Sequence, residues 1–371
     1  MVEFSDIKTI TPPILAKLQE EGVLTVESIN YISRDEMKEM FKGIRVGEDK
    51  IKEIKMEVWK KTGAWYMPAN ALRKDELVLT TGCEAIDSML KNPIESCGGG
   101  IRSRTITEFV GKGATGKTEY LYNIITISLD KNKDWGAIFY DTEATFSDVR
   151  FREICQNRGF DAEDIMKRVF VVQIWNTEHF EEAVKQADII IKSRNVKIMC
   201  VDSLIGSIRA EETGRGELAE RQQRLNKLLR RLLNIARAFN SVVVVTNQVS
   251  DKPDQMFTFD PVELHPPVGG NIIGHNDNNR IYLRKVSGTG QVRVARLFDS
   301  NMFPPSERPY VITSKGIEDV ENWRETSSKL EQKAKMMPTT MDTKAKAQVS
   351  EEEPVPPSPE TPTESEAVSG E

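Results

Sequence analysis

The chain contains few residues of the kinds that build disulfide-rich, membrane-spanning or histidine-based metalloproteins. Its 371 residues include four cysteines, which lie far apart without a CxxC spacing, so we expect reduced thiols in a reducing compartment. Three histidines argue against a transition-metal site built from imidazoles. No apolar run approaches the roughly 20 residues of a membrane helix, and the first residues lack a signal-peptide pattern. These absences favour a soluble cytoplasmic protein without a membrane partner.

The acidic residues are unevenly distributed along the chain. The formal net charge is −6, and residues 338–371 alone hold eight carboxylates against two lysines. The rest of the chain therefore carries equal numbers of basic and acidic side chains, and it can present local basic patches to a nucleic acid. The terminal residues are also rich in proline and contain no aromatic residue, so we predict that 324–371 forms a disordered acidic tail.

Residues 1–62 are predicted to form a small helical domain. Pro12 and Pro13 suit the first turn of a helix, and apolar residues recur at helical spacing as far as Val58. The turn Gly43–Gly47 separates two helices and suits backbone N–H donation to a phosphate, as in helix-hairpin-helix DNA-binding modules. A helical bundle used only for packing explains the same residues equally well, and both interpretations stay open. Residues 63–76 are predicted to be a linker.

Residues 77–323 alternate between apolar runs and amphipathic helical patterns, which predicts an α/β core. Strands separated by helices need crossover connections, so the central sheet should be mainly parallel. A short glycine-containing turn at residues 287–290 separates the last two strands, which predicts an antiparallel hairpin at one edge of the sheet. The expected strands are Ile106–Val110, Ala137–Asp141, Val169–Trp175, Ile198–Asp202, Val242–Asn247, Arg280–Lys285 and Val292–Asp299.

The strongest signal in the sequence is a phosphate-binding loop of the form G-x-x-x-x-G-K-[ST]. It follows an expected strand and precedes an amphipathic helix, which is the context that the motif requires. Glycines let backbone N–H groups surround a phosphate at a helix N-terminus. Lys117 would neutralise the β- and γ-phosphates of ATP, and the hydroxyl of Thr118 would ligate Mg²⁺. The loop consists of Gly111, Lys112, Gly113, Ala114, Thr115, Gly116, Lys117 and Thr118.

Polar residues end three of the other expected strands. Asp202 ends an apolar strand in the Walker B manner and would hold Mg²⁺, through water. Glu143 lies just beyond another strand and would act as the general base for the water that attacks the γ-phosphate. Gln248 follows a third strand, where its amide would sense the γ-phosphate. Because ligands of α/β folds bind at the carboxyl edge of the sheet, we expect these side chains to meet there.

Two segments without a periodic pattern carry the candidate DNA contacts. Residues 249–270 contain four prolines, and residues 209–217 place two arginines beside glycines. Structureless stretches of this kind in a compact core are usually functional or disordered. We predict that Arg209, Arg215 and Arg221 contact DNA phosphates. The basic residues farther along the following helix, from Arg224 to Arg237, are interpreted as a solvated helix face.

Further motifs occur in the order found in one family. They resemble the RecA-superfamily strand-exchange recombinases of the archaeal RadA type, over roughly residues 60–320. The motifs are Asp141–Phe146, Val201–Leu204, Gly214–Gln222, Val245–Val249, Val268–Asn271 and Tyr282–Lys285. The resemblance implies a RecA-like ATPase core that uses ATP and Mg²⁺ and forms a homo-oligomeric filament on single-stranded DNA. It also implies strand exchange with double-stranded DNA during recombination and repair, and association with the nucleoid.

The resemblance assigns roles around the nucleotide to individual residues. Glu143 matches the catalytic glutamate of the family, and Arg150 matches an arginine that helps to hold the nucleotide. Gln248 and His275 match residues that contact the γ-phosphate. The stretch from Asp299 to Pro304 resembles the cap that covers the ATP of the neighbouring subunit.

The resemblance extends to assembly, where Tyr66 and Ala69 resemble the aromatic-x-x-Ala plug by which each protomer docks on the next. The chain departs from the family pattern at several positions, among them Glu212 and Asn301, and two alternatives therefore stay open. A recombinase paralogue would bind ATP and DNA and modulate filaments without exchanging strands. A nucleotide-switched binding protein would use ATP to hold one conformation, with hydrolysis incidental.

Overall fold

The structure is a computed structural model of the chain. It describes residues 2–66, 68–71, 75–92, 98–206, 218–250, 262, 265–268, 279–286 and 291–328, without the side chains of Asn70 and of 218–221. Several predictions lie outside these residues. They are the tail from residue 329 onward, the roles of Arg209, Arg215 and His275, and most of the segment 249–270.

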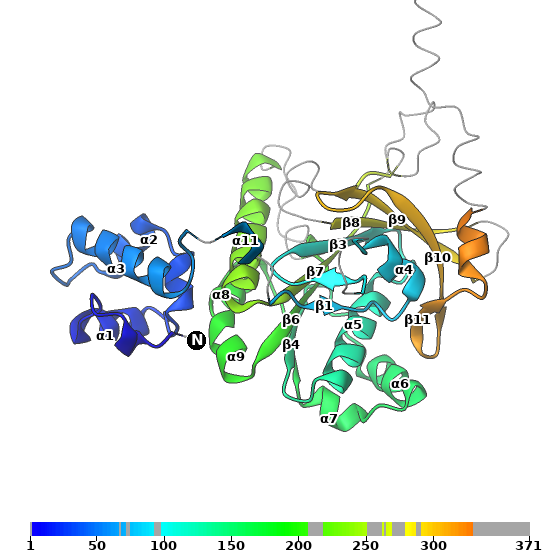
Figure 1. The fold of residues 1–371 in the computed structure, drawn as a ribbon, viewed down its shortest axis with the longest axis horizontal. Coiled ribbons are helices and arrows are strands. Elements are labelled where there is room, and N and C mark those ends of the chain that lie inside the picture. Colours follow the sequence, from blue (N-terminus) through cyan, green and yellow to red (C-terminus); the bar gives the residue numbers. More distant parts are fainter. Residues whose placement is uncertain are drawn as a thin grey trace, which may run out of the picture. The chain divides into compact units, whose positions relative to one another are not determined.

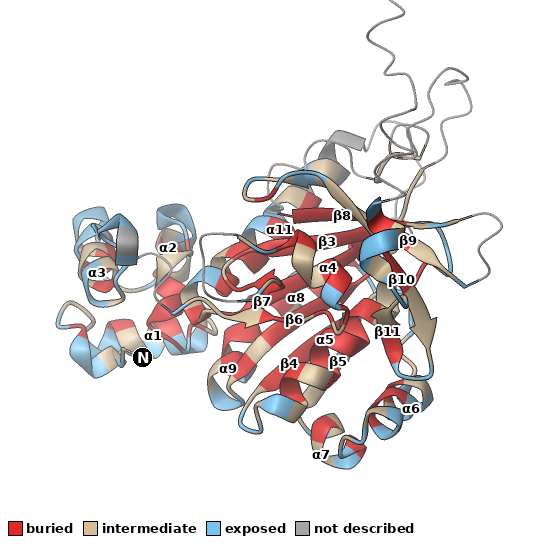
Figure 2. Ribbon diagram, turned by 45° about the vertical axis from the view of Figure 1, so that its right-hand side comes forward, coloured by how far each residue is buried: buried red, intermediate tan, exposed pale blue. Residues whose placement is uncertain are grey.

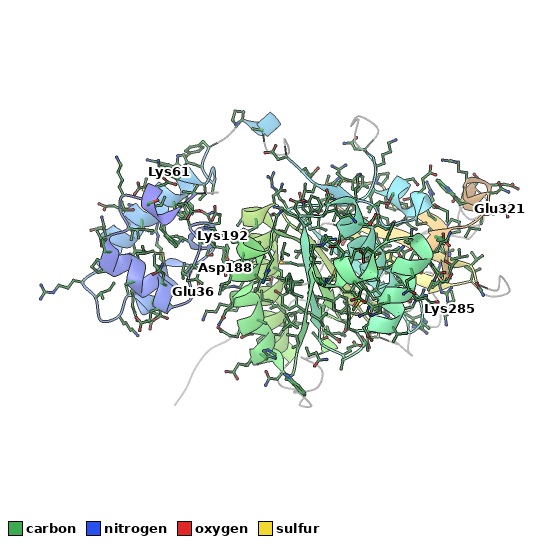
Figure 3. The ribbon with its side chains drawn as sticks, turned by 90° about the horizontal axis from the view of Figure 1, so that it is seen from below. Glu36, Lys61, Asp188, Lys192, Lys285 and Glu321 are labelled. Carbon is green, nitrogen blue, oxygen red and sulfur yellow. The ribbon has the colours of Figure 1, made fainter. Side chains whose placement is uncertain are left out.

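The N-terminal residues form the short helices that the sequence predicts. The elements are η1 (Phe4–Asp6), α1 (Pro12–Glu20), η2 (Glu27–Asn30), α2 (Arg34–Met40) and α3 (Glu48–Lys61). Glu36 on α2 and Lys61 on α3 are labelled in Figure 3. The hydroxyl of Ser33 accepts the N–H of Glu36, whose carboxylate in turn accepts the N–H of Ser33, so a capping box starts α2. Apolar side chains of these elements, including Leu18 and Val58, form a cluster of their own.

In the described part of the core, nine strands form a sheet in the order β11-β10-β9-β8-β3-β7-β6-β4-β5 (Figure 1). The six strands from β8 to β5 pair in parallel, whereas β8, β9, β10 and β11 pair antiparallel in succession. This arrangement confirms the predicted α/β fold with a mainly parallel sheet. The strands are β3 (Ile106–Gly111), β4 (Gly136–Asp141), β5 (Val169–Gln173), β6 (Val196–Asp202), β7 (Val242–Asn247), β8 (Asn279–Lys285), β9 (Arg293–Ser300), β10 (Ser306–Thr313) and β11 (Gly316–Asp319).

Helices cover both faces of the sheet, and the central strands β3, β7, β6 and β4 are buried between them (Figure 2). Side chains alternate along each parallel strand, so that Ile198 and Cys200 of β6 join one apolar cluster and Met199 and Val201 join the other. The first cluster includes residues of α4 (Glu84–Met89), α5 (Lys117–Lys131), α6 (Asp148–Arg158) and α7 (Ala162–Met166). The second includes residues of α8 (Thr177–Lys185), α9 (Ala187–Ser193) and α11 (Leu218–Phe239). The chain also forms η3 (Ala69–Ala71) and a two-stranded sheet of β1 (Val78–Leu79) and β2 (Ile101–Arg102), which adds Leu79 and Ile101 to the first cluster.

The structure corrects two details of the predicted strands. β5 ends at Gln173 rather than at Trp175, because Trp175 is 82% exposed and the side chain of Asn176 already caps α8. The hairpin of β8 and β9 is antiparallel as predicted, but it does not lie at the edge of the sheet. β10 and β11 extend the sheet beyond it, and the sequence analysis missed both strands. Pro309 inside β10 weakens the strand signal there.

The last strand, β11, is hydrogen-bonded to α4, the first helix of the core, and to α5. The carboxylate of Asp319 on β11 accepts the N–H groups of Glu84 and Ala85 at 2.8 Å each, and so caps the N-terminus of α4. The side-chain amide of Asn123 on α5 donates to the carbonyl of Thr81 at 3.1 Å and to that of Ile317 at 2.8 Å. Hydrogen bonds therefore connect residues 81–85, near the start of the core, to β11, its last strand.

Candidate nucleotide site and its surroundings

The phosphate-binding loop connects the end of β3 to the start of α5. Gly116 adopts a left-handed conformation, with φ 98°, and a Cβ atom there would lie 2.7 Å from Cδ1 of Ile312. A Cβ atom on Gly111 would lie 2.5 Å from the carbonyl oxygen of Leu283. The hydroxyl of Tyr310 donates to the carbonyl of Thr115 at 2.6 Å and fixes the loop from the side of β10. Both glycines are therefore required by local geometry.

The loop borders a cavity of about 750 Å³, a size typical of small-molecule sites. The predicted catalytic and metal-binding residues Lys117, Thr118, Glu143, Asp202 and Gln248 all line it. Strands on both sides of β3 contribute. Asp202 ends β6 and Glu143 follows β4, whereas Arg293 and Ile312 lie on β9 and β10, on the other side of β3. The remaining lining residues are Gly111, Lys112, Gly113, Ala114, Gly116, Glu119, Thr145, Ser203 and Val249.

Lys117 is held against the phosphate-binding loop. Its ammonium group donates to the carbonyls of Gly111 at 2.9 Å and Lys112 at 3.1 Å. Burial lowers the pKa of Lys117, and the nearby carboxylates of Asp202 and Glu143 oppose that shift. A polyphosphate in the cavity would further stabilise the charged ammonium form.

Thr118 and Asp202 provide an oxygen-rich pair at the bottom of the cavity. The hydroxyl of Thr118 donates to Oδ2 of Asp202 at 2.6 Å, and Thr246 donates to Oδ1. Asp202 is 4% exposed, and burial raises the pKa of its carboxyl group. A hydroxyl and a buried carboxylate are the ligands that Mg²⁺ prefers beside a phosphate, and a divalent cation would offset the cost of burying this charge. These two residues therefore fit a Mg²⁺ ion, which would neutralise phosphate charge.

Glu143 lies at the mouth of the cavity with its Oε1 atom fixed from two sides. The hydroxyl of Ser203 donates to this oxygen, and the side-chain amide of Gln248 donates to it at 2.8 Å. The loop that carries Glu143 is held by Asp141, whose carboxylate accepts the N–H groups of residues 145 and 146 at 3.0 Å each. The sequence analysis did not assign a role to Ser203, although its position directly after Asp202 places it at the same sheet edge. The arrangement leaves Glu143 oriented towards a ligand in the cavity.

The other residues expected near the nucleotide do not line the cavity in the described part of the chain. The guanidinium of Arg150 pairs with Glu119 at 2.9 Å and donates to the carbonyl of Thr313 at 2.6 Å. It therefore supports the cavity wall through Glu119, which does line the cavity. Asp299 and Pro304 are both exposed, as a cap on a neighbouring subunit requires.

The residues of the predicted docking plug are exposed. Tyr66 is 93% exposed, and Ala69 lies in the exposed turn η3. The ring of Tyr66 contacts Trp65 edge to face, with centroids 5.3 Å apart. Trp65 in turn stacks on Trp59 of α3, at 6.1 Å and an interplanar angle of 14°. This stack holds the start of the linker against α3 and leaves the Tyr66 side chain facing solvent.

The expected DNA-contacting regions are described only in part. Arg221 belongs to α11, although its side chain is not described. Lys227, Arg230 and Arg237 are exposed as predicted, but Arg224 and Arg231 are half-buried, so the face of α11 is only partly solvated. The positions of Arg224 and Arg231 border the buried leucines of the helix, and the aliphatic stems of arginines cover such apolar surface.

The two ends of the segment 249–270 lie side by side next to the cavity. Val249 forms an antiparallel bridge with Pro267, and the N–H of Ser250 donates to the carbonyl of Pro266 at 2.9 Å. The N–H of Val268 donates to the carbonyl of Gln248 at 3.0 Å. We call this paired region, residues 248–250 with 266–268, the neck. The neck begins at the residue whose side chain contacts Glu143.

The fold and the site define the class of protein. The site has the arrangement of a RecA-like P-loop ATPase. A phosphate-binding loop follows β3, a buried Asp ends β6, the second strand from β3, and a Glu follows β4, the strand beside β6. Residues 72–320 match the model of the Rad51 family, and the chain belongs to that family. The family comprises ATP- and DNA-binding recombinases of the RecA superfamily that assemble into filaments. Among the helices that the structure describes, none is long and apolar enough to cross a membrane.

Proposed function

We propose that this protein is an ATP-dependent strand-exchange recombinase of the archaeal RadA type. It forms a filament on single-stranded DNA, pairs it with a homologous duplex and acts in recombination and repair in the cytoplasm, at the nucleoid. The observation that carries this proposal is the contact between Gln248 and Glu143. One residue touches the candidate general base and also begins the neck of the segment expected to contact DNA. DNA on that segment would therefore act directly on hydrolysis.

In the proposed reaction each residue of the site has its own role. Lys117 binds the β- and γ-phosphates, and Thr118 and Asp202 hold the Mg²⁺ ion that neutralises them. Glu143 accepts a proton from the attacking water, while Ser203 and Gln248 keep its Oε1 atom in position. Gln248 would shift its hydrogen bond towards the γ-phosphate when ATP is present.

Assembly would supply the remaining parts of the site. Tyr66 and Ala69 would dock on the next protomer, and Asp299 and Pro304 would then cover the nucleotide of a neighbour. Their exposure supports this assignment, because side chains that complete a neighbouring site must be accessible to solvent in the isolated protomer. Arg209, Arg215 and Arg221 would contact the phosphates of DNA inside the filament.

The decisive experiment measures ATP hydrolysis with and without single-stranded DNA, followed by strand exchange between that DNA and a labelled homologous duplex. We expect DNA to stimulate hydrolysis and ATP to be required for exchange. A protein that binds ATP and DNA but exchanges no strands would instead be a filament-modulating paralogue. The absence of any DNA stimulation would refute the proposed coupling of DNA to hydrolysis.

A further inference from the structure

A buried polar cluster lies between the phosphate-binding strand and its two neighbours. Glu108 is fully buried in β3, three residues before the phosphate-binding loop begins. Arg280 lies opposite Glu108 on the neighbouring strand β8, and its Nε atom donates to Oε2 of Glu108 at 2.6 Å. Asn247 at the end of β7 donates through its side-chain amide to Oε1 of the same carboxylate, also at 2.6 Å. The three residues, Glu108, Asn247 and Arg280, are called the β3 cluster below.

Through Asn247 the β3 cluster fixes both sides of the neck. The side-chain amide of Asn247 also donates to the carbonyl of Val268 at 2.9 Å, and its Oδ1 atom accepts the N–H of Gln248 at 2.8 Å. Asn247 is fully buried, and its amide can satisfy these partners in only one orientation. The backbone position of Gln248, and hence its reach to Glu143, therefore depends on Glu108.

Through Arg280 the β3 cluster reaches the surface expected to cover a neighbouring nucleotide. Nη1 of Arg280 lies 3.7 Å from Oδ2 of Asp299 on β9, and its guanidinium lies over the ring of Phe298, 5.0 Å from the centroid. One buried carboxylate thus connects the candidate general base, the neck and the cap. In the described part of the chain, no member of the cluster lines the cavity, so none is placed to touch the nucleotide.

Stability alone gives no reason for this arrangement. Replacing a buried ion pair by apolar residues of similar volume is often neutral or stabilising, and the neighbouring strand β7 shows that apolar residues fit beside β3, since residues 242–245 are four buried valines. Retaining a buried charge at this position fixes one geometry, because its hydrogen bonds have strict directions.

We propose that Glu108, Asn247 and Arg280 are positioning residues that couple ATP hydrolysis to what is bound at the neck and at the cap. The inference rests on the proposed function and names how that function is regulated. A ligand that moves the neck would displace Asn247, and the displacement would pass through Glu108 and Arg280 to Asp299. Removing the cluster should therefore leave nucleotide binding intact while it disconnects hydrolysis from DNA.

The test compares the double variant Glu108→Leu/Arg280→Met, which removes the acceptor for Asn247 as well as the ion pair, with the parental protein. Removing both charges together avoids an unpaired buried charge. The measurements are affinity for a fluorescent ATP analogue, basal ATP hydrolysis and its stimulation by single-stranded DNA. We expect the affinity to change by about twofold or less and the stimulation to fall by about fivefold or more, which is the range of a typical coupling energy.

A control is the ion pair of Arg168 with Asp164 on α7, 2.6 Å apart, in which the guanidinium of Arg168 also donates to backbone carbonyls of residues 129, 132 and 135 and neither residue lines the cavity. Its double variant Asp164→Leu/Arg168→Met should retain the DNA stimulation even if its melting temperature falls. A second variant, Asn247→Ala, keeps both charges of the β3 cluster and should also lose the stimulation. It decides the question if the first double variant does not fold.

The possible outcomes separate the two proposals. Parental stimulation in folded Glu108→Leu/Arg280→Met or Asn247→Ala protein would overturn the coupling role and leave the proposed function standing. Equal loss of stimulation in the control pair would assign the effect to general destabilisation and overturn it as well. No stimulation in the parental protein would refute the proposed function, and the coupling would fall with it.

Discussion

Replacing Glu143 by glutamine gives the sharpest test of the candidate general base. The side chain keeps its size, but a neutral amide cannot accept a proton from the attacking water. In the structure, Oε1 of Glu143 accepts hydrogen bonds from Ser203 and from the amide of Gln248. The substituted side chain can keep both bonds by placing its own amide oxygen at the Oε1 position. The loop geometry and the binding of ATP should therefore be preserved.

General-base catalysis typically contributes a factor of 10² to 10⁴. We expect the turnover of Glu143→Gln to fall by about 100-fold, which corresponds to about 2.7 kcal/mol in the activation free energy. The affinity for a fluorescent ATP analogue should stay within about twofold, because the P-loop contacts that dominate binding are untouched. Single-turnover hydrolysis at saturating ATP measures the chemical step separately from product release.

Two further variants serve as comparisons for Glu143→Gln. Ser203→Ala removes one hydrogen bond to Glu143 but leaves the base, so hydrolysis should fall by about tenfold, less than in Glu143→Gln. Lys117→Ala should instead weaken ATP binding itself, because Lys117 lies against the loop that holds the phosphates. Hydrolysis by Glu143→Gln at the parental rate would show that another group activates the water.

Three further predictions address assembly, DNA contact and pH. Tyr66→Ala should abolish filaments and leave a folded monomer, since an aromatic anchor in a partner's pocket is worth roughly 2 kcal/mol or more; parental-size assemblies in light scattering would contradict this. Arg215→Ala should weaken single-stranded DNA binding and lower its salt slope by about 0.7, whereas Arg230→Ala should not. Burial raises the pKa of Asp87 to about 6, so its folded form holds a proton that the unfolded chain has released. Its contribution to stability is therefore present below about pH 4 and lost as the pH rises through about 6, by about 3 kcal/mol, and Asp87→Asn should lack this dependence in denaturant unfolding.

The nucleotide site could be predicted because its signals are local. The spacing of the phosphate-binding loop specifies a turn and a helix start within eight residues, and the structure places both where the sequence predicts. Asp202 and Glu143 could also be predicted, because the ends of parallel strands meet at one edge of the sheet.

Residues whose role depends on contacts between distant segments could not be predicted. Glu108 lies in a run that reads as an apolar strand, and nothing near it in the sequence indicates that Arg280 is its partner. The ion pair of Arg150 with Glu119 likewise joins two different helices and has no local signal in the sequence. Such pairs depend on which strands and helices become neighbours, and hydrophobic periodicity does not encode that order.

The cap that Asp319 forms on α4 has a consequence for synthesis on the ribosome. A domain that emerges from its N-terminus can fold only once all the segments that it requires have left the exit tunnel. The N-terminal helices bury an apolar cluster formed by residues between 7 and 58, so all the residues of this cluster are translated early. The helix that opens the core, in contrast, receives its cap from a residue more than two hundred positions later. The P-loop ATPase core is therefore expected to stay incomplete until nearly all of it has been translated, and to expose apolar strands during that interval.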